Sequence, residues 1–185
     1  MLLSFLLRCI GIYSKPLSYT TIKNIKNIYY NNLLTYDIYS NETITNNNLL
    51  TAEHIFPQSY TKKYKDAKRD MHNIFLTNAE TNIYRSNYPF RDENNCFHLQ
   101  EYKYFIPCDF AKGQIARSIA YMKLIYPLLD VGKVIDIELL LYWNKQFEPH
   151  FLEHNRNILI NNIQGNYNPF ICDPNLIYKF FHIFN

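Results

Sequence analysis

A succession of strand, charged loop, strand and helix between residues 49 and 88 constrains the fold of this chain more than any other feature. Apolar and β-branched residues predict strands over 49–56 and 72–77, and Asn78 is a typical N-cap for a helix over 79–86. The loop over 61–69 has a local charge of +4, from one acid, Asp66, and five bases: Lys62, Lys63, Lys65, Lys68 and Arg69. This local charge exceeds the chain's formal net charge of +3, so the positive excess lies between the two strands.

Helical spacing of apolar residues dominates the rest of the chain. It predicts helices over roughly 2–12, 19–34, 113–128 and 135–147, ahead of a polar carboxy-terminal segment, and a further short strand is expected over 36–39. The 185 residues are 48% hydrophobic, which is enough for a core, and they show no internal repeat or flexible linker. We expect one domain over 1–185 with a predominantly helical α+β fold.

Several classes of protein are disfavoured by the composition. The four cysteines form no CxxC pair, so neither a zinc ribbon nor a redox pair is indicated; they are Cys9, Cys96, Cys108 and Cys172. Arg8 interrupts the apolar amino terminus, which we interpret as a buried helix rather than a signal peptide. No stretch reaches the ~18–20 uncharged apolar residues that span a bilayer, so no membrane association is expected. The sequence leaves the compartment open.

The residues with the clearest chemical potential stand where the first predicted strand ends. Glu53 and His54 are neighbours, and both can serve one site only where a strand ends or bends, as Pro57 indicates here. If the next strand and helix fold back, Asn82 lies beside Glu53, and the two supply oxygen ligands for a hard cation such as Mg²⁺. His54 is then free to act as a base near neutral pH.

Three ordered motifs carry a family resemblance: Glu53-His54-Ile-Phe-Pro-Gln-Ser59, Asp70-Met-His72-Asn73, and Asn82-Ile-Tyr-Arg85-Ser-Asn87-Tyr-Pro-Phe90. They resemble the motifs of the bacterial endonuclease I family, which belongs to the ββα-metal, or His-Me finger, nucleases. The similarity continues through Lys112 to Met122, Trp143-Asn-Lys145, Asn155-Arg156-Asn157 and Gln164 to Phe170. It covers nearly the whole chain and implies a finger over approximately 49–88.

The resemblance implies metal-dependent cleavage of DNA, with RNA as a second substrate, little sequence preference and 5′-phosphate products. By similarity His54 is the general base, Glu53 and Asn82 hold one Mg²⁺ or Mn²⁺ ion, and Asn73 fixes the loop that carries His54. Arg69, Arg85 and Arg117 are candidates to grip phosphates, since a guanidinium makes paired hydrogen bonds to them. The cationic loop 61–69 would attract nucleic acid without regard to sequence.

Alternative interpretations stay open for several of these residues. The chain could be an inactive nucleic-acid-binding or packaging protein of the same fold, although such a protein needs no base beside a metal pair. Arg85 and Asn87 could tie the helix to the finger, and His72 is better explained by backbone hydrogen bonds than by a role in the site. We expect a monomer, and a nuclease without an export signal implies protection of the cell by an inhibitor or another control.

Overall fold

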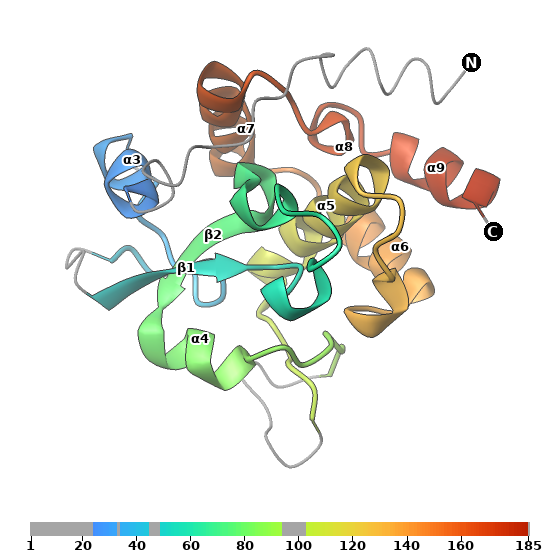
Figure 1. The fold of residues 1–185 in the computed structure, drawn as a ribbon, viewed down its shortest axis with the longest axis horizontal. Coiled ribbons are helices and arrows are strands. Elements are labelled where there is room, and N and C mark those ends of the chain that lie inside the picture. Colours follow the sequence, from blue (N-terminus) through green and yellow to red (C-terminus); the bar gives the residue numbers. More distant parts are fainter. Residues whose placement is uncertain (1–23, 33, 45–48, 94–102, 185) are drawn as a thin grey trace.

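The computed structural model describes residues 24–32, 34–44, 49–93 and 103–184, and within them a small sheet is surrounded by helices (Figure 1). Strand β1 (Leu50–His54) pairs antiparallel with β2 (Ile74–Asn78), with Glu53 opposite Phe75. Helix α4 (Ala79–Arg85) follows β2 directly and packs on both strands. Its N-cap is Asn78, whose side chain accepts the Glu80 N–H at 2.9 Å, as predicted. The fold is therefore α+β, as the sequence indicates.

Helix α5 (Asp109–Ile125) runs through the centre of the molecule, and most of its residues are buried. Gly113 permits its close approach to Phe147, because a Cβ at this position would lie 2.2 Å from the Phe147 carbonyl oxygen. The remaining helices are α3 (Ile25–Asn31), α6 (Ile137–Gln146), α7 (Phe151–Gln164), α8 (Pro169–Cys172) and α9 (Leu176–Phe184). The helices predicted over 113–128 and 135–147 are confirmed as α5 and α6, with shifted ends.

Two of the strands predicted from the sequence, those over 72–77 and 36–39, differ from the structure. The second strand begins at residue 74 rather than 72, because His72 and Asn73 belong to the 3-10 turn η4 (Met71–Asn73), where the Asp70 carboxylate accepts the His72 N–H. The strand over 36–39 is wrong. The Asp37 carboxylate accepts the N–H groups of Tyr39 and Ser40 and so turns the chain there.

The carboxy-terminal segment, expected to be merely polar, forms α7, α8 and α9. Helix α7 buries Glu153, Arg156, Asn157 and Gln164, so its inward face is polar and conceals the helical pattern. These groups find partners; Glu153 pairs with Arg117 of α5 at 2.7 Å, for example. Of the two predicted amino-terminal helices, 2–12 lies outside the described residues, and within 19–34 the described helix is Ile25–Asn31.

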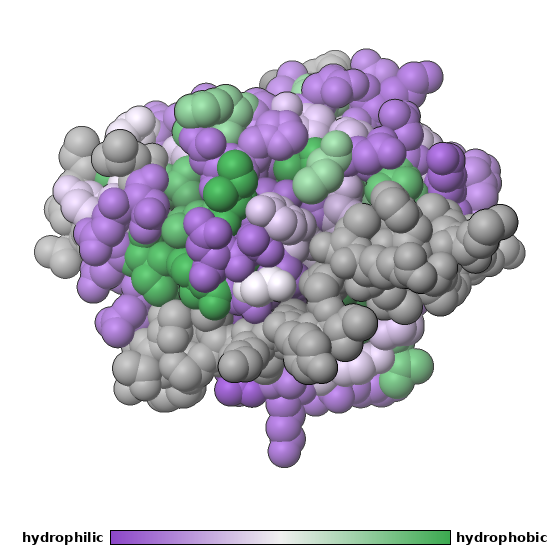
Figure 2. Space-filling view, turned by 90° about the horizontal axis from the view of Figure 1, so that it is seen from above, coloured by the Kyte–Doolittle hydropathy of each residue, from purple (hydrophilic) through white to green (hydrophobic). Residues whose placement is uncertain are grey.

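Figure 2 shows the molecule from above the view of Figure 1, the side on which α7 lies. Hydrophilic residues cover much of this face, and hydrophobic residues gather on its left half. Helix α4 lies at the opposite, lower edge of Figure 1. Every helix in the described part of the chain is too short or too polar to cross a membrane.

Candidate active site

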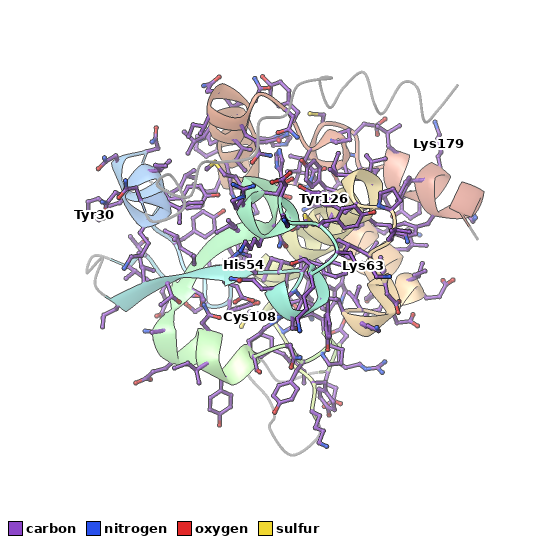
Figure 3. The ribbon with its side chains drawn as sticks, in the orientation of Figure 1. Tyr30, His54, Lys63, Cys108, Tyr126 and Lys179 are labelled. Atoms are coloured by element: carbon purple, nitrogen blue, oxygen red, sulfur yellow. The ribbon has the colours of Figure 1, made fainter. Side chains whose placement is uncertain are left out.

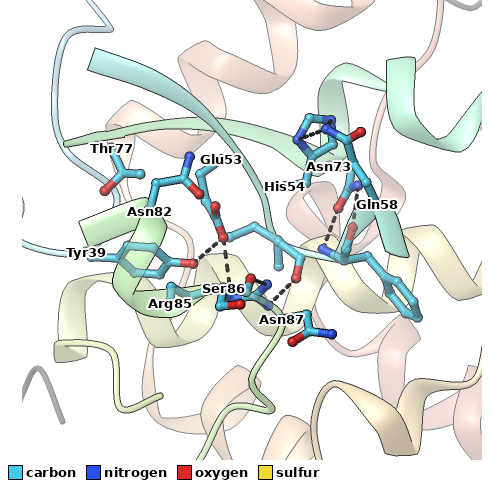
Figure 4. A network of polar contacts seen from close by, with 12 residues as sticks. Tyr39, Glu53, His54, Gln58, Asn73, Thr77, Asn82, Arg85, Ser86 and Asn87 are labelled. Carbon is cyan, nitrogen blue, oxygen red and sulfur yellow. Dashed lines mark hydrogen bonds and ion pairs between the residues drawn. The ribbon is translucent and has the colours of Figure 1, made fainter. Parts of the chain in front are cut away.

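Glu53 is a buried carboxylate at the inner side of β1, with 2% of its surface exposed. Its Oε1 atom accepts a 2.7 Å hydrogen bond from the Tyr39 hydroxyl and lies 3.4 Å from Nε of Arg85 (Figure 4). Burial raises the pKa of Glu53, and the charge of Arg85 and the Tyr39 hydrogen bond oppose that rise. A second positive charge at this carboxylate would further stabilise its ionised form.

His54 ends β1, and its two ring nitrogens have different neighbours. Nε2 lies 2.9 Å from the Lys68 carbonyl oxygen, and since a carbonyl only accepts, Nε2 carries the proton in the neutral ring. Nδ1 then carries the lone pair of the ring and accepts a 3.3 Å hydrogen bond from Nε2 of Gln58. Burial lowers the pKa of His54, so the imidazole is neutral near pH 7 and can accept a proton at Nδ1.

Asn73 holds the segment that follows His54. Its Oδ1 accepts the Phe56 N–H at 2.7 Å, and its Nδ2 donates to the Phe56 carbonyl at 3.0 Å. The Ile55 N–H donates to the Asn73 carbonyl at 3.1 Å. Asn73 is fully buried, so its side chain fixes the backbone two residues beyond His54 rather than facing solvent.

Asn82 projects from α4 toward β1. Its Nδ2 donates to Thr51 Oγ1 at 2.9 Å and to the Ala52 carbonyl at 3.2 Å. With the amide nitrogen held by these two acceptors, the carboxamide oxygen turns away from them, and Figure 4 shows it beside the Glu53 carboxylate. The hydrogen bonds therefore present an oxygen, and not an N–H group, next to the buried acid.

These side chains share one cavity of about 530 Å³, whose wall is formed by Ala52, Glu53, His54, Pro57, Gln58, Ser59, Asn82, Ser86 and Asn87. The predicted base and both predicted ligands are thus brought together. Asn73 lies behind the cavity rather than in its wall. The wall also contains Gln58 and Ser86, which the sequence did not single out.

The residues present fit a hard divalent cation. Among the described residues, no group of three or more His, Cys, Asp or Glu side chains is arranged to hold a metal, which disfavours a zinc centre. Glu53 and Asn82 instead offer one carboxylate and one amide oxygen beside an open cavity. Mg²⁺ is commonly held by one or two such groups and keeps most of its water.

The three candidate arginines lie in different surroundings. Arg85 is 1% exposed, with Nη2 donating to the Ile55 carbonyl at 2.7 Å. Arg117 is fully buried and donates to Glu153, Asn144 and the Phe147 carbonyl, so it joins α5 to the segment around α7 and does not line the cavity. Arg69 is partly exposed and pairs with Asp66.

The four lysines of the cationic loop are exposed: Lys62, Lys63, Lys65 and Lys68. The loop lies beside the site, because the Lys68 carbonyl accepts the His54 ring N–H and the loop follows the cavity residues Gln58 and Ser59. Figure 3 shows Lys63 to the right of His54. The structure therefore brings the predicted phosphate-attracting charges next to the predicted base.

Besides Ser86, the sequence does not single out Tyr39 or Gln58. Tyr39 falls in a predicted strand, and in a chain with 17 tyrosines nothing marks it as the partner of Glu53. Gln58 stands inside the quoted Glu53–Ser59 motif, so its position was the available signal. Its contact with Nδ1 depends on the 3-10 turn η2 (Gln58–Tyr60), which propensity does not reveal.

The fold and site define a small α+β protein in which a two-stranded sheet and a helix gather a carboxylate, a carboxamide and a neutral imidazole around one cavity. Residues 9–175 match the family model described as Endonuclease I. The chain belongs to the endonuclease I family.

Curated relatives are similar over part of the chain. An extracellular deoxyribonuclease of Aeromonas hydrophila is 34% identical over 122 residues, covering 60% of this chain and 52% of the relative. Endonuclease-1 of Buchnera aphidicola subsp. Acyrthosiphon pisum is 34% identical over 119 residues, covering 60% and 47%. A periplasmic deoxyribonuclease of Aeromonas hydrophila is also 34% identical over 119 residues, covering 59% and 49%. The matches thus span about half the length of these relatives.

Proposed function

We propose that this chain is a divalent-metal-dependent endonuclease of the ββα-metal type that hydrolyses phosphodiester bonds in DNA, with RNA as a second substrate. The observation that carries the proposal is the shared cavity of Glu53, Asn82 and His54. The deoxyribonuclease names of the relatives support the substrate class. Family membership supports the reaction type.

His54 is the proposed general base. The Lys68 carbonyl accepts a hydrogen bond from Nε2, so the basic nitrogen is Nδ1, whose neighbour Gln58 lines the cavity together with His54. A water molecule that replaces the Gln58 amide at Nδ1 gives one proton to this nitrogen as the water oxygen attacks phosphorus. The bond from phosphorus to the 3′ oxygen breaks, and the released oxygen takes a proton from solvent water, which leaves a 5′-phosphate and a 3′-hydroxyl.

Glu53 and Asn82 are the proposed ligands of one Mg²⁺ or Mn²⁺ ion. When bound, such an ion supplies Lewis-acid stabilisation of the charge that develops on the phosphate and on the leaving oxygen. Arg85 and Tyr39 both contact Oε1, so they orient the Glu53 carboxylate within the wall. Asn73 positions the backbone that follows the base.

The remaining predicted residues have supporting roles in this proposal. The exposed lysines attract phosphates without reading bases, which agrees with low sequence preference. Arg69 is the last residue of this loop, and its Nη2 pairs with Asp66, which leaves other guanidinium N–H groups for a phosphate. Arg117 acts through the fold, because its guanidinium is committed to Glu153 on α7.

A plasmid assay tests the proposal directly. The chain should nick and linearise supercoiled DNA with Mg²⁺, and a chelator should abolish cleavage. His54→Ala should lower the rate by about 10²- to 10⁴-fold, the usual contribution of a general base. The matched control is His182→Ala, because His182 is exposed on α9, away from the cavity wall.

Two outcomes would contradict the proposal. Equal rates for the native chain and His54→Ala would remove His54 as the base. Salt-sensitive DNA binding without metal-dependent cleavage would instead support the binding or packaging alternative. The nature of the ends is tested separately, because products with 5′-phosphates can be ligated without prior treatment by a kinase.

A further inference from the structure

Ser86 has a strained backbone conformation in the wall of the proposed active site. It follows α4 directly, and its φ of 51° and ψ of −125° lie in a region that glycine adopts freely and other residues avoid. Among the described residues other than glycine, positive φ angles occur at Asn41, Ser86 and Lys103, and of these three Ser86 alone lines the cavity. Strained residues cluster at functional sites, where the surrounding contacts hold them in place.

Contacts with both proposed metal ligands hold the Ser86 backbone. Its N–H donates to the Asn82 carbonyl at 3.0 Å, and its carbonyl accepts a 2.9 Å hydrogen bond from Nη1 of Arg85. Nε of the same arginine lies 3.4 Å from the Glu53 carboxylate. The groups that form the site therefore also fix the strained residue.

The 86–87 turn, defined as Ser86 and Asn87, offers two polar side chains to a ligand in the cavity. Both residues line the cavity, and Figure 4 shows them below Glu53 and His54. The Asn87 backbone is held by its carbonyl, which accepts the Tyr60 hydroxyl at 3.4 Å. In the part of the chain that the structure describes, the Ser86 hydroxyl and the Asn87 carboxamide make no hydrogen bond to another residue. Both groups can therefore donate to a ligand.

The composition of the cavity wall indicates the chemistry of that ligand. None of the described residues that line the cavity is a lysine or an arginine, and Arg85 behind the wall is only 1% exposed. A phosphodiester inside the cavity can therefore obtain hydrogen bonds from neutral side chains of the wall. Hydroxyl and carboxamide groups are common donors to phosphate oxygens. The 86–87 turn supplies one of each.

We infer that Ser86 and Asn87 bind the phosphodiester in the cavity, each donating a hydrogen bond to a nonbridging phosphate oxygen. The strain at Ser86 is retained because it directs both donors into the cavity. This inference rests on the proposed function and adds two substrate-binding residues to it. Donors that are already fixed need no reorganisation as negative charge grows on the phosphate, so they favour cleavage as well as binding.

Ser86→Gly separates the strain from the hydroxyl group. Glycine adopts the positive φ without strain, so the melting temperature measured with a chelator should rise by about 2–4 °C. Plasmid cleavage with Mg²⁺ should nevertheless fall by about tenfold, because the hydroxyl is lost. Ser86→Ala keeps the strain and loses the hydroxyl, so its cleavage should fall similarly without a rise in melting temperature. The matched control is Asn41→Gly, at a positive φ outside the cavity wall, which should cleave at the native rate.

DNA binding provides a second readout that needs no metal. It is measured by fluorescence anisotropy with a short labelled DNA duplex and a chelator that prevents cleavage. Asn87→Ala should weaken binding by about 2- to 10-fold, the range for one hydrogen bond. Asn87→Asp should weaken it further, because a carboxylate repels phosphate and cannot donate. Asn41→Asp controls for the added charge and should weaken binding less than Asn87→Asp does.

The inference is overturned if Ser86→Gly cleaves DNA at the native rate, since Ser86 would then serve only the shape of the turn. It is also overturned if Asn87→Asp binds DNA as well as Asn87→Ala, or no more weakly than Asn41→Asp. A melting temperature of Ser86→Gly at or below the native value would remove the argument from strain. Failure of the proposed function looks different: the native chain then leaves plasmid DNA intact with Mg²⁺, while the binding measurement still tests the contact with phosphate.

Discussion

Glu53 and Asp70 are both buried carboxylates that accept tyrosine hydrogen bonds, yet they occupy opposite kinds of environment. Asp70 is surrounded by donors: the His72 N–H at 3.0 Å, Gln164 Nε2 at 2.9 Å, and the hydroxyls of Tyr121 and Tyr126 at 3.0 Å each. Both of its oxygens are used. The Tyr39 and Arg85 contacts of Glu53 fall on the single atom Oε1, and the side chain borders a cavity.

This difference separates a structural carboxylate from one that can bind a ligand. Burial raises the pKa of both groups, so each needs partners to stay ionised. Asp70 obtains them from the chain itself and thereby fixes the turn that carries Asn73. Glu53 is open on one side, where a cation can complete its surroundings.

The largest expected effect comes from removing Asp70. Asp70→Ala leaves several buried donors without an acceptor, so we expect the free energy of unfolding to fall by about 3 kcal/mol or more. Urea denaturation with Mg²⁺ absent measures this loss. Cleavage per folded molecule should stay within about tenfold of the native value if Asp70 acts only through the fold. A loss below about 1 kcal/mol would contradict the structural role.

Glu53→Gln should show the reverse of the pattern expected for Asp70→Ala, with the main effect on magnesium-dependent cleavage rather than on stability. The amide keeps the shape of the side chain but lacks the charge that a cation prefers, so the Mg²⁺ concentration for half-maximal cleavage should rise by about 10- to 100-fold or more. A magnesium titration of plasmid cleavage measures the change, with Asp70→Asn as the matched amide control. Equal magnesium requirements in the two variants would remove the distinction between the carboxylates.

The Asp70 region also predicts a pH effect through His72, whose backbone N–H bonds to Asp70. Burial, assisted by the charge of Arg156, lowers the pKa of His72 to about 3. Below pH 6.5 the unfolded chain binds a proton at this ring and the folded chain does not, so stability falls as pH falls from 6.5 toward 3. The loss approaches about 1.4 kcal/mol per pH unit, or about 2 kcal/mol by pH 5.

Urea denaturation of the native chain and His72→Gln between pH 5 and 8 checks this effect. Both proteins keep Asp70 and His54, so the difference between their pH slopes isolates His72. The variant should lose less stability on acidification. If the free energy of unfolding depended on pH equally in the native chain and the variant, His72 would be protonated in the folded protein or would titrate equally in the folded and unfolded states.

The comparison also explains what the sequence could reveal. The main residues of the proposed site lie within a short stretch of the sequence, in motifs that can be recognised without the tertiary structure: Glu53, His54, Asn73 and Asn82. The Asp70 cluster draws Tyr121, Tyr126 and Gln164 from about 50 or more positions away, so only folding brings it together. The sequence does not predict helix α7 for the same reason. Burial of its polar groups is favourable only when partners from distant parts of the chain are present.

The smallest effects are expected from removing a single hydroxyl group, either at Tyr126 or at Tyr39. Tyr126→Phe removes one of several donors to Asp70, and we expect a loss of about 0.5–1.5 kcal/mol in unfolding free energy with unchanged magnesium dependence. Tyr39→Phe removes a donor that orients Glu53. Its rise in magnesium requirement should exceed that of Tyr126→Phe, because a freed carboxylate samples more rotamers before it binds a cation. Urea denaturation and magnesium titration on the same two variants give the answer, and identical behaviour in both assays would show that the two tyrosines serve one structural purpose.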